Sequence, residues 1–350
     1  MNTIVLGATA VGEGHPPYII AEIGSNHNGD MDLCRTLNDA AADAGADAVK
    51  FQSWSESSLI AAEEYHRNPE YSDKKKHFGS LREMVRAYQL TPEHHVIARD
   101  YCMTKGVEFC SSPFSPDEAD LLESLDVPFF KIASMDVVNL PLLAYVAAKR
   151  RPLIIATGMA TLGEVERAVE TVRGEGNDDI ALLHCVSIYP PDYASIRLLN
   201  IQMLRRTFGV PVGFSDHTLG TSIPLAAIAL GACIIEKHFT VDKDMAGWDH
   251  AISADPVELR TIVEDGRHVF DSLGGYPRVV TEAEMQKRER FRRSLVARRG
   301  LDRGHVLSED DLSAKRPGSG IPPDEMRYVL GRTLAADIEE DHVLRWSDLH

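Results

Sequence analysis

The sequence is poor in cysteine and has no long hydrophobic run. Only five of the 350 residues are cysteine, and no two of them form a CxxC pair. They are typical of reduced thiols in a cytoplasmic protein rather than of a disulfide scaffold. The longest mostly apolar stretch, residues 224–235, is too short to cross a bilayer, so no membrane partner is expected.

Positive charge is also in short supply. The chain has 37 basic and 53 acidic residues, which gives a net charge of −16. A general nucleic-acid binder or a protein held on anionic lipid needs a positive field, so both classes are excluded. An anionic substrate is still compatible, because a few lysines in a pocket can reverse the sign locally.

Targeting and nucleotide-binding motifs are missing as well. The first 17 residues have no basic segment followed by an apolar core, so no signal peptide is expected and the predicted location is cytoplasmic. No glycine-rich stretch matches GxGxxG or GxxxxGK[ST], which leaves no nucleotide-binding fingerprint.

What the sequence does contain is a regular alternation of short apolar runs and longer stretches with helical periodicity. Most of the runs lack polar alternation, which is typical of parallel strands buried on both faces. Eight such strands, each followed by a helix, predict an α/β fold of the (β/α)8, or TIM-barrel, type. The runs are residues 18–24, 48–53, 107–114, 129–134, 152–158, 180–187, 211–216 and 233–239.

The composition changes near residue 275, which predicts a second domain. We expect a barrel with an N-terminal hairpin over residues 1–275, a linker over 276–291 and a small β-rich domain over 292–350. Within the barrel, a long polar excursion over residues 53–80 contains Lys74–Lys76 and leads into one helix at about 81–105. Such an excursion is either a functional lid or a solvated loop.

The active site of a barrel lies at the C-terminal ends of its strands, so polar residues there are the candidates. His217 and His238 end neighbouring strands about 5 Å apart and can reach one divalent metal ion, unless one of them only bonds nearby backbone. The full set of strand-end candidates is Glu22, Lys50, Gln52, Ser112, Lys131, Ser134, Asp136, Thr157, His184, Ser187, Tyr189, Asp216, His217, Glu236 and His238.

Lys50 and Lys131 form a second notable pair. A lysine buried at a strand end is costly unless it meets an anion or loses its charge. An anionic substrate bearing phosphate or carboxylate explains both lysines, with Ser112 and Ser134 as added hydroxyl donors. A Schiff-base lysine would also explain one of them, because barrel aldolases place such a lysine in a similar position.

Eight motifs in order resemble those of the sialic acid (N-acetylneuraminate) synthase family. They are AEIGSNHNG, AVKFQSW, SSPFS, FKIASMD, ATGMAT, LLHCVSIYP, GFSDHT and EKHFT. The tail, with AKRPGSGIPP, is similar to the SAF, or antifreeze-like, domain of the same enzymes. The resemblance implies a metal-dependent condensation of phosphoenolpyruvate with an N-acetylmannosamine-type aldehyde, which yields a nonulosonic acid and phosphate.

The resemblance also implies roles for individual residues. Glu22 matches the catalytic carboxylate, and His217 and His238 would hold Mn²⁺ or Mg²⁺. Arg316 would reach the sugar from the C-terminal domain of the other subunit in a domain-swapped homodimer. The residues implied to bind phosphoenolpyruvate are Lys50, Ser112, Lys131, Ser134, Ser187 and Ser215, and those implied to bind the sugar are Gln52, Asp136, Tyr189, Asp249 and Arg316.

Two positions depart from the family pattern. Ser187 stands where synthases that use N-acetylmannosamine have Asn, and Asp136 stands where they have Glu. The sequence therefore also allows a different aldehyde, from polysaccharide or secondary-metabolite biosynthesis, because one or two polar changes can switch a substrate. It further allows a Schiff-base keto-acid aldolase and a non-enzymatic carbohydrate- or ice-binding protein.

Overall fold

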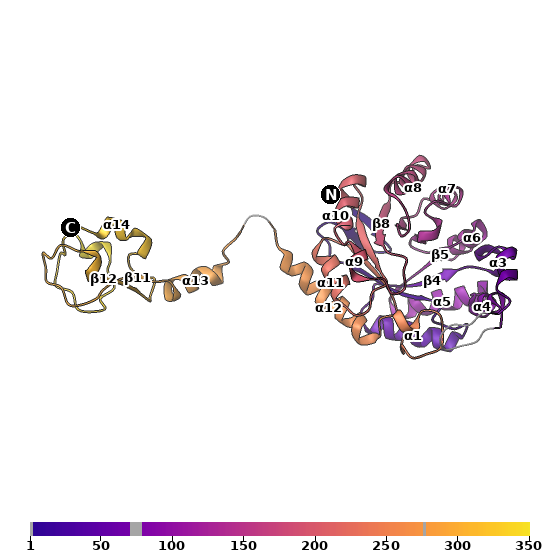
Figure 1. Cartoon of the computed structure of the whole chain (residues 1–350), viewed down its shortest axis with the longest axis horizontal. Helices are drawn as coiled ribbons and strands as arrows, with labels where there is room; N and C mark the ends of the chain where they lie inside the picture. Colours follow the sequence, from indigo (N-terminus) through magenta and orange to yellow (C-terminus); the bar gives the residue numbers. More distant parts are fainter. Residues whose placement is uncertain (1–2, 71–78, 276–277) are drawn as a thin grey trace. The chain divides into compact units, whose positions relative to one another are not determined.

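The structure is a computed structural model that describes residues 3–70, 79–275 and 278–350. The chain divides into two compact units, Met1–Gly274 and Gly275–His350 (Figure 1). Each unit is described by itself. None of the described helices combines the length and the apolar composition that crossing a bilayer requires.

The first unit is built on an eight-stranded parallel sheet that curves into a TIM-like barrel. Each of the eight predicted runs contains one strand, which confirms the predicted fold class. The hydrogen-bonded order is β5-β4-β3-β10-β9-β8-β7-β6. The strands are β3 (Tyr18–Gly24), β4 (Ala48–Ser53), β5 (Glu108–Pro113), β6 (Phe130–Ile132), β7 (Leu153–Ala156), β8 (Ile180–Cys185), β9 (Val212–Asp216) and β10 (Ile234–His238).

The first and last strands of the barrel are joined directly. β3 pairs with β10 in parallel, with His238 opposite Glu22. The two ends of the hydrogen-bonded order, β5 and β6, lie against each other. Within the described residues no backbone ladder joins β5 to β6, since β6 has only three residues. The carboxyl ends of all eight strands therefore meet at one rim.

Helices alternate with the strands and cover the outside of the sheet (Figure 1). Several begin at side-chain caps, as at Thr161, whose hydroxyl and Glu164 form a reciprocal capping box. The helices are α1 (Met31–Asp43), α2 (Glu56–Leu59), α3 (Ala62–Arg67), α4 (Leu81–Tyr88), α5 (Pro92–Lys105), α6 (Pro116–Ser124), α7 (Leu140–Ala147), α8 (Leu162–Gly174), α9 (Tyr193–Ile196), α10 (Asn200–Phe208), α11 (Ser222–Ala229) and α12 (Pro256–Leu273).

The prediction of one helix over residues 81–105 is wrong, because α4 and α5 are separate. Gln89 ends α4 in an extended conformation, and Thr91 is the N-cap of α5. Pro92 explains the break, since proline lacks an N–H and disfavours helical backbone in the residue before it. The run Lys74–Lys76, in the segment predicted to be a lid or a solvated loop, lies outside the described residues.

A hairpin at the N-terminus contributes to the barrel interior. Its strands β1 (Thr3–Leu6) and β2 (Thr9–Gly12) pair antiparallel. Ile4, Leu6 and Val11 are buried in the same apolar cluster as Phe129 and Leu183 of the barrel. This cluster fills the interior below the strand ends, while a larger cluster lies between sheet and helices. Polar side chains are thereby concentrated at the opposite, carboxyl end.

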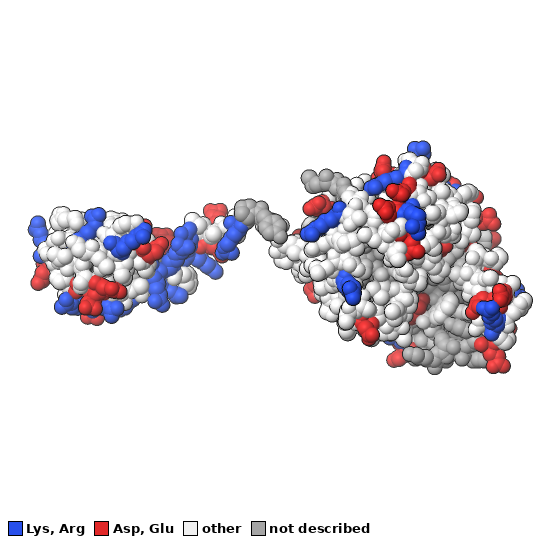
Figure 2. Space-filling view, turned by 45° about the horizontal axis from the view of Figure 1, so that its top comes forward, with Lys and Arg blue, Asp and Glu red and all other residues white. Residues whose placement is uncertain are grey.

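The second unit has a core of its own. It contains α13 (Glu282–Phe291), the antiparallel pair β11 (Ser294–Ala297) and β12 (Leu312–Lys315), and α14 (Met326–Val329). Eleven buried apolar residues pack together in it. The unit carries 14 basic and 14 acidic residues, which leaves 23 basic and 39 acidic residues in the first unit. Basic side chains gather around the last turn of α13, which contains Arg288 and Arg290 (Figure 2).

Candidate active site

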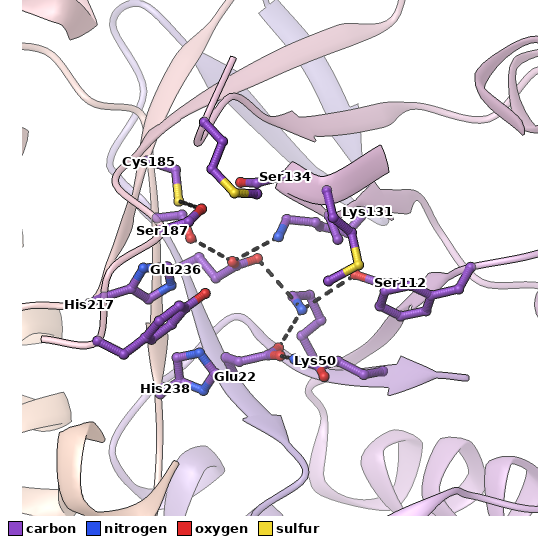
Figure 3. Close-up of a pocket in the computed structure, with 17 residues that line it drawn as sticks. Glu22, Lys50, Ser112, Lys131, Ser134, Cys185, Ser187, His217, Glu236 and His238 are labelled. Atoms are coloured by element: carbon purple, nitrogen blue, oxygen red, sulfur yellow. Dashed lines mark hydrogen bonds and ion pairs between the residues drawn. The ribbon is translucent and has the colours of Figure 1, made fainter. Parts of the chain in front are cut away.

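A cavity of about 250 Å³ opens at the carboxyl ends of the barrel strands (Figure 3). It is polar where the rest of the barrel interior is apolar. Twelve of the residues predicted from the sequence line it: Glu22, Lys50, Gln52, Ser112, Lys131, Ser134, Ser187, Tyr189, Ser215, His217, Glu236 and His238. The structure thus brings together residues from the ends of every barrel strand except β7.

Two lysines and two carboxylates form the floor of the cavity (Figure 3). Lys50 Nζ lies 2.5 Å from Glu22 Oε2 and 3.9 Å from Glu236 Oε2. Lys131 Nζ lies 3.0 Å from Glu236 Oε1, which also accepts a hydrogen bond from Ser215 at 2.8 Å. Each buried cation therefore has a buried counter-ion, as its burial requires.

The surroundings shift the pKa values of the two carboxylates in opposite directions. Burial raises the pKa of Glu22 above its ordinary value, although Lys50 partly offsets this. Burial acts the same way on Glu236, but Lys131 and Lys50 outweigh it and hold the pKa of Glu236 well below its ordinary value. Glu22 is thus suited to exchanging a proton, while Glu236 stays ionised.

The same charges favour anion binding over Schiff-base chemistry. Burial alone would lower the pKa of Lys50, but Glu22 and Glu236 raise it above its ordinary value. A Schiff base needs a neutral amine, which desolvation without counter-ions would provide. Lys50 instead remains an ammonium that can bind a carboxylate or phosphate.

The two histidines lie side by side at the cavity wall. Their ring centroids are 5.5 Å apart, and the ring of Tyr189 lies 4.1 Å from that of His217. His217 Nδ1 is 2.9 Å from the carbonyl of Val186. Burial lowers the pKa of His217, but a hydrogen bond with Cys185 outweighs it and raises the pKa above its ordinary value. Burial lowers the pKa of His238 to about 4, so this imidazole is neutral at physiological pH.

These two side chains fit a divalent metal ion. Within the described part of the chain, the buried Nδ1 of His238 has no hydrogen-bond partner. Among residues 3–70, 79–275 and 278–350, no group of three or more His, Cys, Asp or Glu side chains is arranged to hold a metal. A cation would therefore take two imidazoles from the protein and its other ligands from water or substrate oxygens.

The serines surround the charged floor. Ser112 Oγ lies 3.5 Å from Lys50 Nζ, and Ser134 Oγ accepts a hydrogen bond of 3.1 Å from the backbone N–H of Gly158. A Cβ at Gly158 would lie 2.2 Å from Ser187 Oγ and 2.7 Å from Ser134 Oγ. The turn after β7 therefore needs glycine to let these two hydroxyls reach the cavity.

Six predicted residues do not line the cavity: Asp136, Thr157, His184, Asp216, Asp249 and Arg316. Thr157 and His184 line a neighbouring cavity instead. Asp249 Oδ2 lies 3.8 Å from His238 Nδ1. Asp136 is buried in the turn after β6, where its carboxylate accepts a hydrogen bond of 3.0 Å from Asn139, and burial raises its pKa. Arg316 belongs to the second unit, with its guanidinium 4.9 Å above the ring of Phe291.

Other residues of the cavity received no role from the sequence. Glu236 was recognised at a strand end, but its contact with both lysines was not anticipated. Alternation along β10 could have found it, because Glu236 and His238 are two residues apart and share one face of the strand. The lining residues without a predicted role are Phe114, Ala133, Met135, Met159, Cys185 and Glu236.

Comparisons with known proteins agree with this geometry. The model of the NeuB family matches residues 37–277, and that of the SAF domain matches residues 292–350. An uncharacterized protein of Methanocaldococcus jannaschii is 41% identical over 349 residues, which cover 100% of this chain and 99% of the relative.

A relative with a named activity is similar over nearly its whole length. The N,N'-diacetyllegionaminic acid synthase of Legionella pneumophila is 39% identical, with 99% of each chain covered. Among solved structures, the N-acetylneuraminic acid synthetase of Leptospira borgpetersenii matches with a TM-score of 0.73 and 32% identity. The match covers 81% of this chain and 94% of that one.

Proposed function

The chain belongs to the NeuB family, and from this premise we propose that it condenses phosphoenolpyruvate with the aldehyde of an amino sugar. The products would be a nonulosonic acid and phosphate. The observation that carries the proposal is the pairing of Lys50 and Lys131 on the cavity floor beside His217 and His238. The two lysines suit phosphoenolpyruvate, which is a small trianion, and the two histidines suit a metal cation next to the aldehyde.

Phosphoenolpyruvate would bind where the two ammonium groups face the cavity. Lys50 and Lys131 would exchange part of their contact with Glu22 and Glu236 for the carboxylate and phosphate of the substrate. Charge-assisted hydrogen bonds of this kind are about twice as strong as neutral ones. Ser112, Ser134, Ser187 and Ser215, which line the same cavity, would add hydroxyl donors.

The bonds change in a defined order in this proposal. Carbon three of phosphoenolpyruvate forms a bond to the aldehyde carbon, and the aldehyde oxygen becomes an alkoxide. Water then adds to the electron-poor carbon two, and Glu22 takes its proton and passes it to the alkoxide, which becomes a hydroxyl. Cleavage of the bond between carbon two and the bridging oxygen releases phosphate and leaves the 2-keto acid. Burial raises the pKa of Glu22, which makes it a stronger base for this transfer than an exposed carboxylate.

A divalent ion such as Mn²⁺ or Mg²⁺, held by His217 and His238, would polarise the aldehyde carbonyl as a Lewis acid. Tyr189 packs on His217 and limits the orientations of its ring. Val186 accepts from the other ring nitrogen and fixes the tautomer.

We propose that the sugar is a 6-deoxy-diacetamido hexose rather than N-acetylmannosamine. The L. pneumophila relative is named as a diacetyllegionaminic acid synthase. In this chain, Ser187, which lines the cavity, is shorter than the Asn expected for N-acetylmannosamine. Phe114, Met135 and Met159 give the cavity an apolar side that suits a methyl better than a hydroxyl.

We also propose that the enzyme works as a homodimer in the cytoplasm, with Arg316 of a second copy reaching the sugar. Four large apolar side chains around the cavity are at least half exposed, as expected of a surface that a second subunit covers: Met135, Met159, Ile188 and Tyr189. All five cysteines are free thiols, which suits a reducing compartment.

Phosphate release from phosphoenolpyruvate with Mn²⁺, measured across a panel of aldehydes, tests this function. The panel contains N-acetylmannosamine, its 6-phosphate and the two 6-deoxy-diacetamido hexoses that precede pseudaminic and legionaminic acids. We expect release with a diacetamido sugar and its loss with a chelator. Release with N-acetylmannosamine alone would overturn the sugar assignment, and chelator-resistant release would overturn the role of the metal.

A further inference from the structure

A buried ion pair lies directly behind the two histidines. Asp216 is the last residue of β9, and Lys237 lies opposite it on β10. Side chains alternate along a strand, so Asp216 and Lys237 point away from the cavity while Ser215, Glu236 and His238 point into it. The Asp216 side chain is 0% exposed and that of Lys237 is 2% exposed.

The pair holds three backbone positions at once. Lys237 Nζ lies 2.6 Å from Asp216 Oδ2 and donates to the carbonyl of Thr218 at 2.5 Å. Asp216 Oδ1 accepts from the N–H of Thr218 at 2.9 Å. His217 stands between Asp216 and Thr218, and His238 follows Lys237. The pair therefore links Asp216 and Thr218, which flank His217, to Lys237, which precedes His238.

Stability alone does not account for charged residues at these two positions. Moving two charges out of water carries a large desolvation penalty, and an apolar pair of similar volume is often as stable as a buried ion pair. An apolar pair, however, forms no directional hydrogen bonds to the backbone. A carboxylate that accepts from both Lys237 and Thr218 fixes the path of the backbone through His217, whereas methyl groups would leave it less defined.

We propose that Asp216 and Lys237 are positioning residues that set the separation of His217 and His238 for binding one divalent cation. Neither side chain touches substrate or metal. Their effect is exerted through the backbone, while the contact of His217 Nδ1 with Val186 orients the ring itself. The inference rests on the proposed function only in that the two imidazoles bind a metal.

The test measures Mn²⁺ affinity from the electron paramagnetic resonance signal of free Mn²⁺, in the full chain and without substrates. The main variant is the double substitution Asp216→Leu with Lys237→Met, which removes both charges and leaves none unpaired. The single variant Asp216→Asn keeps an acceptor for Thr218 and weakens the bond to Lys237. Lys149→Met is the matched control, because Lys149 is a mostly buried lysine with two carboxylate partners far from any candidate ligand.

We expect the double variant to bind Mn²⁺ about 10- to 100-fold more weakly, as for other residues that orient ligands. Its metal-free melting temperature should stay close to that of the wild type, and Lys149→Met should leave Mn²⁺ affinity unchanged. Asp216→Asn should give a smaller loss in the same direction, which keeps the test decisive if the double variant does not fold. An Mn²⁺ affinity within threefold of the wild type in a folded variant would overturn the inference.

The outcome can be separated from that of the proposed function. If the wild type binds Mn²⁺ but condenses no aldehyde, the proposed function fails and the positioning role is still tested by affinity. If the wild type binds no Mn²⁺, the positioning role fails together with the metal site.

Discussion

Glu22 and Glu236 show how two identical side chains acquire different roles. Both are buried in the same cavity, but Glu236 faces two ammonium groups, whereas Glu22 pairs with the single ammonium group of Lys50 and accepts a hydrogen bond of 2.7 Å from Gln52. The difference in counter-ions separates their pKa values: that of Glu22 lies above the ordinary value and that of Glu236 below it, so Glu22 is the stronger base of the two.

Glu22→Gln should therefore slow phosphate release while the enzyme still binds phosphoenolpyruvate. Loss of a general base typically reduces the rate by about 10²- to 10⁴-fold. Lys50 keeps its charge through Glu236, so substrate affinity measured by calorimetry should not weaken. Glu108→Gln, at the other end of the barrel, is the control. A Glu22→Gln variant with more than a tenth of wild-type activity would contradict the assignment.

His27 makes stability depend on pH. It is buried in the loop after β3, and its Nδ1 accepts from the N–H of Gly29 at 3.0 Å. Burial lowers the pKa of His27 to about 4. Above pH 6.5 the imidazole is neutral in both states, so it has no effect. Below pH 6.5 the unfolded chain takes up a proton that the fold rejects, and stability falls until the pH reaches about 4.

Because of His27, we expect the free energy of unfolding of the first unit to fall by about 2 kcal/mol when the pH is lowered from 7 to 5. His27→Gln should remove that part of the pH dependence, although it lowers stability at pH 7. Denaturant titrations of both proteins at the two pH values measure the difference. Parallel pH dependences in wild type and variant would show that His27 is not held neutral by the fold.

At the scale of elements, the strands were the most predictable part of the molecule. Parallel strands buried on both faces appear as uninterrupted apolar runs, so all eight were found, and their carboxyl ends indicated where a site should lie. The break between α4 and α5 was missed, although Pro92 interrupts the backbone between them. The ion pairs of Glu236 were missed because they depend on which strand faces which across the barrel.

The turn after β7 gives a prediction at this scale. Gly158→Ala places a methyl against the hydroxyls of Ser134 and Ser187, which must then shift from their positions at the cavity. Each hydrogen bond to a charged group is worth about 1.5–3 kcal/mol, so KM for phosphoenolpyruvate should rise about tenfold or more. The melting temperature should change little.

Gly163→Ala is the matched control for that change. It lies in the following helix, α8, and an added Cβ there meets nothing within 4 Å. Its KM should equal that of the wild type. An unchanged KM in Gly158→Ala would show that the two serines do not contact phosphoenolpyruvate.

At the scale of the whole molecule, the net charge is distributed unequally between the two units. The first unit carries the entire net charge of −16, and the second is neutral overall. In the second unit, Gly318 and Gly320 allow close backbone approaches beside Arg316, since a Cβ at Gly318 would lie 2.8 Å from the carbonyl of Arg288. The loop that carries Arg316 is thereby packed against its own unit. Sequence patterns contain no information on which barrel it faces.

Mixing two inactive variants tests whether Arg316 acts on the other subunit. A heterodimer of Glu22→Gln and Arg316→Ala has one intact site only if the arginine is supplied by the partner. Random reassociation of a symmetric dimer should then restore about a quarter of wild-type activity. No recovery after confirmed subunit exchange would place Arg316 at the site of its own chain or outside the reaction.

The most direct test of the account is the fate of the bridging oxygen of phosphoenolpyruvate. The substrate labelled with ¹⁸O at that atom is converted with Mn²⁺ and the accepted aldehyde, and phosphate and keto acid are analysed by mass spectrometry. Addition of water at carbon two predicts that the label appears in phosphate. Label retained in the keto acid would mean that the bond to phosphorus breaks instead, and would contradict the roles given to Glu22 and the cavity lysines.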